Sequence, residues 1–508
     1  MLPSSQMPKI QPQLRQVVKL DDARQGQHKA ISRAAILENV AGAEVTFRRC
    51  WRVVEMLVSG RVEPDSGQSI IDFQTDLLPA IVALESQYRH IRQEEKRLIA
   101  RKGNYSLEWF KRRMAALDSH KKPLLHALAI GRALGDGFAW FFYERDRQLI
   151  LEHHKHQRQV LLPPSDGGLG ERLALENLQG FDKKLLLYHG LTSFLRLGDV
   201  SLIDLKQLRV ACIGELKTTR VSDEVLNLQI DFIAGKRDAL PKQAPLQTST
   251  RARAALPQAL EARRERQVRE MRQAIVNAAV KRATPIKPID GDFHYDKLDE
   301  VVSRSHCRAF EYVQAGPSLI LGAVRLLRPG ELLKDIYSRR RSVDRLARNV
   351  AEWALKILDP RLPNNSILLG DIGSGPDELA APRSGLPLLW WGTNASTLRQ
   401  ILFGEVLVLT IYNPAHLWAQ LQERGFELEF TEKGKLKHAH RRRGDKLMEL
   451  HNFDYFHHLV THQLMRLESV CDMIEETIRF TSEASDGRPL KVEIDPVISR
   501  RPKRSSYS

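Results

Sequence analysis

Residues 198–218 read GDVSLIDLKQLRVACIGELKT, and this stretch predicts a β-hairpin with charged side chains gathered at one end. Its two strands, 198–204 and 209–218, are rich in apolar and β-branched residues, and a tight turn separates them. Because side chains alternate along a strand, Glu215 and Lys217 share one face of the second strand. The hairpin therefore places an acid and a base side by side.

Asp199 opens the first strand, so we expect it opposite the end of the second strand, beside Glu215 and Lys217. The apolar run 210–213 indicates a buried strand, where charged groups cost free energy unless they are paired or bind a metal. Two carboxylates are hard oxygen ligands that suit Mg²⁺, and a lysine can orient a water or stabilise phosphoryl charge. The three residues predict a site for Mg²⁺-dependent phosphodiester hydrolysis.

An acid on one strand followed by acid-x-lysine on the next resembles the signature of the PD-(D/E)XK nuclease superfamily, over about residues 168–235. The resemblance implies a restriction-endonuclease-like αβββα core. It also implies that Asp199, Glu215 and the Leu216 carbonyl bind Mg²⁺, with Mn²⁺ as a substitute. Lys217 would then be the catalytic lysine of a DNA endonuclease.

The same resemblance implies two further site residues. Families with this core often add an acid from the preceding helix, and Glu171 is the better match, with Glu176 second. Many also place a glutamine or a basic residue on the following helix. Gln229 fits that position, because a helix is expected from Ser222 through Phe232. Glu171 and Gln229 therefore complete the expected catalytic set.

The composition favours a folded, basic protein. The 508 residues are 42% hydrophobic and 28% charged, which is typical of a globular chain with roughly two to four structural units. The net charge of +16 favours a polyanion such as nucleic acid or an anionic membrane surface. The sequence shows neither a signal peptide nor an apolar run long enough to span a membrane. We expect a cytoplasmic protein that binds nucleic acid, with DNA as its substrate, and has no membrane partner.

The sequence pattern divides the chain into five parts that together predict a mixed α/β protein. They are a disordered leader over 1–27, a helical region over 28–160, the nuclease-like core over 161–240, a linker and basic helix over 241–288, and a C-terminal α/β module over 289–508.

The C-terminal module is expected to contain several strands and to end in a long helix. The strands are predicted at 318–327, 367–371, 386–391, 406–412 and 426–430, and helices at 341–358, 414–424 and 445–480. The apolar stripe of the last helix offers a surface for a partner protein or a second copy of the chain.

Two histidine groups have spacing that could bind a metal, although a polar flank of a helix is the commoner outcome for both. His451, His458 and His462 fall on one face of the expected terminal helix. His153, His154 and His156 are expected at a solvated helix end.

Two alternatives to the nuclease remain open. The fold could serve as a non-catalytic nucleic-acid-binding or protein-interaction module, or a helical scaffold could carry the short motif by chance. Phage defence would suit a nuclease of this kind by association only. Metal-dependent cleavage that Asp199→Ala and Lys217→Ala both abolish would distinguish the enzyme from the alternatives.

Overall fold

The computed structural model divides the chain into two compact units, Met1–Pro285 and Ile286–Ser508. It describes residues 14–19, 32–61, 67–143, 147–154, 168, 171, 180–181, 184–222, 225–234, 266–277, 292–306, 310–328, 330–338, 367–373, 388–432, 436–444, 446–451 and 453–483. These residues form helices and three antiparallel sheets, which confirms a mixed α/β chain with a helical N-terminal region.

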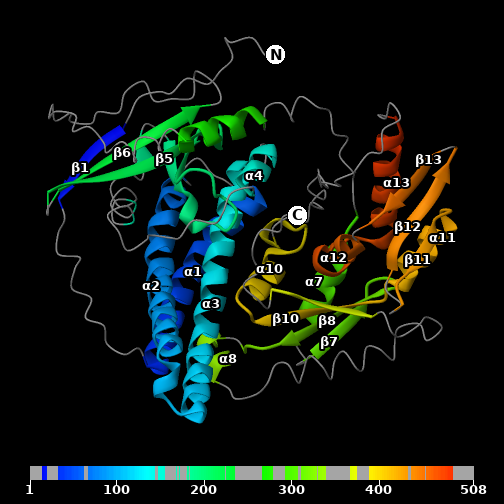
Figure 1. The fold of residues 1–508 in the computed structure, drawn as a ribbon, viewed down its shortest axis with the longest axis horizontal. Helices are drawn as coiled ribbons and strands as arrows, with labels where there is room; N and C mark the ends of the chain where they lie inside the picture. The colour runs from blue at the N-terminus through cyan, green and yellow to red at the C-terminus, as the bar shows by residue number, and fades with distance from the viewer. Residues whose placement is uncertain are drawn as a thin grey trace, which may run out of the picture. The chain divides into compact units, whose positions relative to one another are not determined.

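Three long helices, α1 (Arg33–Ser59), α2 (Gly67–Ala100) and α3 (Leu107–Tyr143), pack against one another in the first unit (Figure 1). The Ser32 side chain accepts a hydrogen bond from the first turn of α1. Gly60 ends that helix at a φ of 69°, a left-handed conformation that glycine adopts without strain. The sequence therefore encodes both ends of α1.

Small residues on α3 allow close packing. A Cβ at Gly131 would lie 2.8 Å from the Phe47 ring and 3.0 Å from Ile81, so this glycine lets α1 and α2 approach. A Cβ at Gly135 would lie 2.1 Å from the Leu191 carbonyl oxygen. The neighbour at Gly135 is thus the backbone of the short 3-10 helix His189–Leu191.

The sheet of the first unit has the order β1-β6-β5-β4-β3-β2, with all neighbours antiparallel. Its strands are β1 (Leu14–Lys19), β2 (Gly180–Phe181), β3 (Lys184–Tyr188), β4 (Val200–Asp204), β5 (Arg209–Ser222) and β6 (Val225–Ala234). Residues 14–19 lie in the leader that the sequence analysis expected to be disordered. That expectation is wrong for these residues, because β1 pairs with β6.

The helix expected after Ser222 is also wrong, because residues 225–234 form β6. The reason is visible in the sequence, where Leu226, Leu228, Ile230 and Phe232 alternate with polar residues. A period of two is typical of a strand with one buried face, and Ile230 and Phe232 are buried. The predicted hairpin of β4 and β5 is confirmed, and it extends into a meander.

The long helices and the six-stranded sheet belong to the same compact unit, Met1–Pro285. On α2, the Gln74 amide donates to the Leu186 carbonyl and accepts from the Tyr188 N–H, both at 2.8 Å. Gln74 therefore satisfies the backbone of β3 as a neighbouring strand would. A short helix, α4 (Arg147–His154), follows the long helix α3.

The second unit contains a four-stranded sheet of order β7-β8-β10-β9 and a three-stranded sheet of order β11-β12-β13. The strands are β7 (Phe310–Gln314), β8 (Leu319–Arg325), β9 (Leu368–Ile372), β10 (Val406–Tyr412), β11 (Glu427–Phe430), β12 (Leu436–Arg443) and β13 (Lys446–Leu450). The helices are α7 (Tyr295–Arg304), α8 (Leu333–Ser338), α10 (Ala395–Leu402), α11 (Ala415–Glu423), α12 (Phe453–Gln463) and α13 (Leu467–Glu483).

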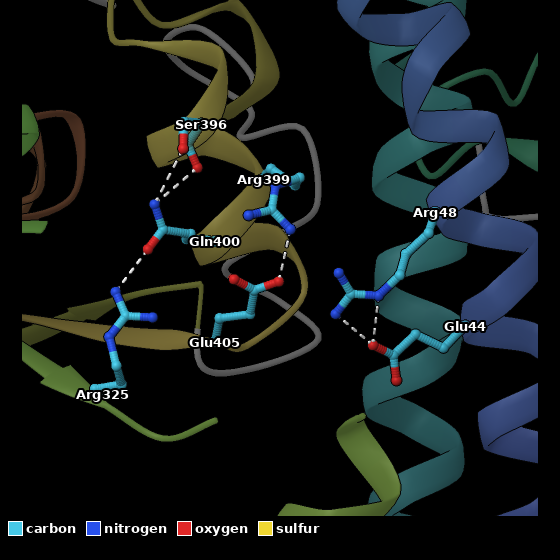
Figure 2. A network of polar contacts seen from close by, with 7 residues as sticks. All are labelled: Glu44, Arg48, Arg325, Ser396, Arg399, Gln400 and Glu405. Atoms are coloured by element: carbon cyan, nitrogen blue, oxygen red, sulfur yellow. Dashed lines mark hydrogen bonds and ion pairs between the residues drawn. The ribbon is translucent and has the colours of Figure 1, made fainter. Parts of the chain in front are cut away.

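Polar contacts tie α10 to the central strands of this unit (Figure 2). Arg325 of β8 donates to the Gln400 side chain at 2.7 Å, and Gln400 in turn donates to Ser396 at 3.2 Å. Arg399 donates to Glu405, which precedes β10, at 2.8 Å. These contacts fix α10 beside β8 and β10.

Two predictions for the second unit are wrong, and one lies outside the described residues. The strand expected at 386–391 contains a 3-10 helix, Leu388–Trp390. The helix expected over 445–480 is β13, α12 and α13, with a break at Leu464, whose φ is 58°. An apolar stripe continues through that break because both helices bury one face, so periodicity alone does not reveal it. The helix expected at 341–358 is not described.

No helix among the described residues is long and apolar enough to cross a membrane.

Candidate active site

The hairpin of β4 and β5 carries Asp199 to the side of Glu215. Val200 pairs with Gly214, and the Asp199 N–H donates to the Gly214 carbonyl at 2.9 Å. The Leu216 N–H donates to the Asp199 carboxylate at 2.8 Å. Asp199 is 8% exposed and Glu215 4% exposed. The two acids that the sequence places at one end of the hairpin are therefore adjacent and buried in the structure.

Lys217 lies on the same face of β5 as Glu215. Its Nζ donates to Glu215 Oε1 at 2.6 Å and to Gln267 Oε1 at 2.5 Å. Gln267 belongs to a helix over residues 266–277, inside the stretch where the sequence predicts a basic helix. The lysine side chain is 25% exposed, against 6% for that of Glu215. Lys217 thus reaches solvent while remaining bonded to the site.

Strand β6 adds two residues to this face. Asp231 pairs with Glu215, and Gln229 pairs with Lys217, so all four side chains lie on one side of the sheet. Gln229 donates to Asp231 at 2.8 Å, and Asp231 is 1% exposed. Gln229 joins the site from a strand and not from the expected helix. Sequence reasoning missed Asp231, although the alternation of polar and apolar residues in β6 would have placed it beside Glu215.

Glu171 also belongs to this neighbourhood. The residue is helical and half-buried, and its carboxylate accepts a hydrogen bond from the Tyr188 hydroxyl. It lies close enough to Asp199 to raise the pKa of that carboxyl. The alternative acid, Glu176, lies outside the described residues. The structure thus brings Glu171 together with the hairpin acids.

The surroundings of Asp199 disfavour its charged form. Burial raises its pKa well above the ordinary value, and the nearby acids Glu215 and Glu171 raise it further. The Leu216 N–H and the Lys217 ammonium lower the pKa, but they do not cancel the other effects. A divalent cation at this position would reverse the balance, because it favours carboxylates over carboxylic acids.

Two glycines of the motif allow the close packing around the acids. Gly198 has a φ of 70°, and a Cβ there would lie 2.7 Å from the Gly214 carbonyl oxygen and 3.0 Å from Met271 Sδ. A Cβ at Gly214 would lie 2.9 Å from the Phe232 ring. Larger residues at either position would push the hairpin away from β6 or from the helix over 266–277.

A buried hydrogen-bond chain fixes the backbone at Asp199. His189 Nδ1 lies 2.9 Å from the Gly198 carbonyl, and its Nε2 lies 2.6 Å from Ser201 Oγ, which also bonds to the Tyr143 hydroxyl. Because a carbonyl only accepts, Nδ1 carries the proton and Nε2 accepts from Ser201. Burial lowers the pKa of His189 to about 4, which agrees with a neutral ring. Ser201 is fully buried, so this pair supports the site and is not an accessible nucleophile.

Helices α3 and α4 anchor the rest of the loop that leads into Asp199. The Ser193 N–H and hydroxyl both donate to Asp136 at 2.6 Å. The N–H groups of Arg196 and Leu197 donate to His153 Nδ1 at 3.1 and 3.0 Å. His153 is fully buried, so the expectation that it lies at a solvated helix end is wrong. The helical region therefore positions the site.

Within the described ranges, no group of three or more His, Cys, Asp or Glu side chains converges as an assembled metal site. The groups that could hold Mg²⁺ are the Asp199 and Glu215 carboxylates and the Leu216 carbonyl. In an extended strand the N–H and C=O of one residue point to the same side, so the Leu216 carbonyl points toward the side of Asp199. Few protein ligands suffice, because Mg²⁺ usually keeps several waters.

A scan against protein-family models gives no match for this chain, and searches of curated proteins and of solved structures give no significant match either. Its function therefore has to be inferred from the geometry of the site.

Proposed function

We propose that this chain is a Mg²⁺-dependent nuclease of the PD-(D/E)XK type that hydrolyses phosphodiester bonds, with DNA as the expected substrate. The observation that carries the proposal is the buried Asp199 carboxyl beside Glu215, with its pKa raised by burial and by neighbouring acids. Such a cluster destabilises the folded chain unless a cation is bound. Carboxylate oxygens are the ligands that Mg²⁺ prefers.

Each residue of the site has a role in this proposal. Asp199, Glu215 and the Leu216 carbonyl would hold Mg²⁺ or Mn²⁺, which polarises a phosphoryl oxygen and acidifies a bound water. Lys217 would donate to the attacking water or to a phosphoryl oxygen, since its ammonium lies 2.6 Å from the Glu215 carboxylate. Gln267 would keep the lysine in place when Glu215 turns toward the ion.

The arrangement of strands supports the restriction-endonuclease-like core in part. Strands β3, β4 and β5 form an antiparallel meander, and the helical Glu171 precedes them. The chain departs from the αβββα pattern after Lys217, because β6 follows β5 where the pattern has a helix. The helix over 266–277 comes later and supplies Gln267 to the lysine. The departure leaves the acids and the lysine together.

Positive charge near the site supports a polyanionic substrate. Arg266 and Arg269 are exposed on the helix that carries Gln267, and the chain has a net charge of +16. Arginines at such positions contact phosphates without regard to base sequence. A substrate strand that reaches Lys217 would therefore meet further cations on this helix.

The test is cleavage of plasmid and single-stranded DNA with Mg²⁺ or Mn²⁺ by the wild type, Asp199→Asn and Lys217→Met. A matched control is Asp204→Asn, because Asp204 lies at the turn end of the same hairpin and caps Lys206 and Gln207. The nuclease predicts metal-dependent cutting in the wild type and the control, and none in the two site variants.

Two results would overturn the proposal. Metal-dependent DNA binding without cutting by the wild type would favour a non-catalytic nucleic-acid-binding module. Cutting that persists in both Asp199→Asn and Lys217→Met would show that a contaminating enzyme or another site is responsible.

A further inference from the structure

The outer face of the three-stranded sheet in the second unit carries alternating histidines and glutamates. They are Glu427 and Glu429 of β11, His438 and His440 of β12, Glu449 of β13, and His451 directly after β13. We call these six residues the His/Glu face. Ala439 and Leu450, which alternate with them, are buried on the opposite side of the sheet. The sheet thus presents imidazoles and carboxylates on one side only.

The strand register brings the three imidazoles together. His438 and His440 are two residues apart on β12, so they share a face. Ala439 pairs with Leu450, so His438 and His451 are the next residues across the two strands. The ring centroid of His438 lies 6.0 Å from that of His440 and 5.7 Å from that of His451. One ring therefore has a histidine neighbour along its strand and another across it.

These distances are close to those of a zinc site. With Zn–N bonds of about 2.0–2.1 Å in tetrahedral geometry, two imidazole centroids on one ion lie about 5 Å apart. Shifts of about 1 Å, within the reach of rotation about side-chain bonds, would bring the rings of His440 and His451 to that spacing from the ring of His438. Two histidines of β12 and a third directly after β13 are therefore placed to share an ion.

A glutamate stands beside each ring. His438 Nε2 lies 2.7 Å from Glu429, His440 Nε2 lies 2.9 Å from Glu427, and the corresponding distance for His451 is 3.2 Å, to Glu449. In a neutral ring that donates through Nε2, the lone pair is on Nδ1, and a histidine that binds metal commonly donates its other N–H to a carboxylate. The glutamates supply such partners and add negative charge.

We propose that the His/Glu face binds Zn²⁺ or a similar divalent transition ion through the imidazoles of His438, His440 and His451. In the described residues these rings do not yet converge on one point, and their Nε2 atoms face glutamates. Binding therefore requires the rings to turn toward one another. Nitrogen ligands distinguish this site from the oxygen ligands proposed for Mg²⁺ in the first unit.

A second histidine pair in the same unit offers an internal control. The rings of His458 and His462, one turn apart on α12, are stacked with centroids 4.4 Å apart. Burial and the neighbouring His462 lower the pKa of His458 to about 4. The sequence placed His451 on a helix with this pair, which is wrong, because His451 precedes α12. His458→Gln therefore removes an imidazole of the same unit outside the His/Glu face.

The experiment titrates the full chain with Zn²⁺ by calorimetry and with Co²⁺ by visible absorption, near pH 7.5. With Mg²⁺ in excess to fill the oxygen site proposed in the first unit, we expect one Zn²⁺ per chain. His440→Gln or His451→Gln should weaken this binding about tenfold or more, and His458→Gln should leave it unchanged. Glu427→Gln keeps all three rings and should weaken binding about tenfold through the loss of an outer partner.

Several results would overturn the proposal. The proposal fails if the wild type does not bind Zn²⁺, or if both His440→Gln and His451→Gln still bind it as the wild type does. It also fails if only His458→Gln loses binding. A thiolate-to-cobalt charge-transfer band would assign the ion to cysteine. Circular dichroism of each variant identifies a failure to fold, and His438→Gln then provides an independent variant of the same site.

Discussion

Two acids of the first unit are about equally buried but titrate in opposite directions. Glu95 of α2 is 4% exposed and lies 2.5 Å from Lys121 and 2.7 Å from Arg92. Burial raises the pKa of Glu95, but the two cations outweigh it, and the pKa lies below its ordinary value. Asp199 is 8% exposed, faces Glu215, and has a raised pKa.

The two acids differ in the charge of the groups beside them. In the bundle, the carboxylate has cationic partners from α2 and α3, so its charge is satisfied when the chain folds. At the hairpin, Asp199 faces Glu215, whose cationic partner is Lys217. Under the proposed function, a cation from solution would bind the Asp199 and Glu215 carboxylates.

The largest effect is expected from Asp199→Asn. Metal-dependent cleavage should fall at least about 100-fold, the size of effect seen when one electrostatic group leaves an active site. Without metal, the free energy of unfolding should rise by about 1 kcal/mol, because a neutral amide avoids the repulsion and can still accept from Leu216. Urea unfolding in a chelator measures this, and a clear loss of stability would contradict the contrast.

Lys121→Met should have the opposite pattern. It removes one of the two cations beside Glu95, so we expect a loss of about 2 kcal/mol in the free energy of unfolding and no change in DNA cleavage per folded molecule. Lys122→Met is the control, because Lys122 is 67% exposed and lies 3.8 Å from the exposed Asp118. A Lys122 variant as destabilised as the Lys121 variant would show that the buried pair has no special role.

The pH dependence of stability should differ in sign between the two acids. A raised pKa means that folded Asp199 binds more protons than the unfolded chain, so its contribution falls as the pH rises above 3.8 toward the folded-state pKa. The contribution of Glu95 is complete above 4.5 and is lost as the pH falls through its lowered pKa. Unfolding of Asp199→Asn and Glu95→Gln against the wild type, across pH in a chelator, measures both. If the effect of each substitution on the free energy of unfolding changes with pH in the same direction, the contrast between Asp199 and Glu95 is refuted.

The smallest effect is expected from Gln267→Ala. Lys217 would lose its contact with the helix over 266–277 but keep Glu215, so the cleavage rate should fall about fivefold, equivalent to about 1 kcal/mol. The Mg²⁺ concentration for half-maximal rate should not change, because Gln267 is not proposed as a metal ligand. Gln273→Ala, on an exposed part of the same helix, is the control.

The hairpin could be predicted because its information is local. The turn, the alternation of 209–218 and the acid at 199 place Asp199 beside Glu215 without knowledge of any other segment. The alternation of apolar and polar residues over 225–232 also predicts the strand β6, with Asp231 on its polar face. The predicted helix start at Ser222 conflicts with this alternation. The helix prediction therefore placed Gln229 on a helix, whereas it lies on β6.

Other parts of the site depend on contacts between distant segments. Gln267 lies 50 residues from Lys217 in the sequence, and the Ser201 hydroxyl meets Tyr143 across 58 residues. No periodicity connects such positions, so their meeting follows from packing of α3 and the helix over 266–277 on the sheet. The three histidines of the His/Glu face also meet only through strand pairing. The sequence pattern does not predict β12 and β13 as strands, so it does not place His451 beside His438 and His440.

Strand β1 has a practical consequence for anyone who shortens this protein. It covers the outer edge of β6 from Leu14 to Lys19, so trimming the first twenty residues as a dispensable tail would expose a row of unsatisfied backbone donors and acceptors. Bare edges of this kind recruit strands from neighbouring molecules. Aggregation of a truncated protein would therefore follow from the loss of β1 beside β6, and not from a defect in the hairpin of β4 and β5.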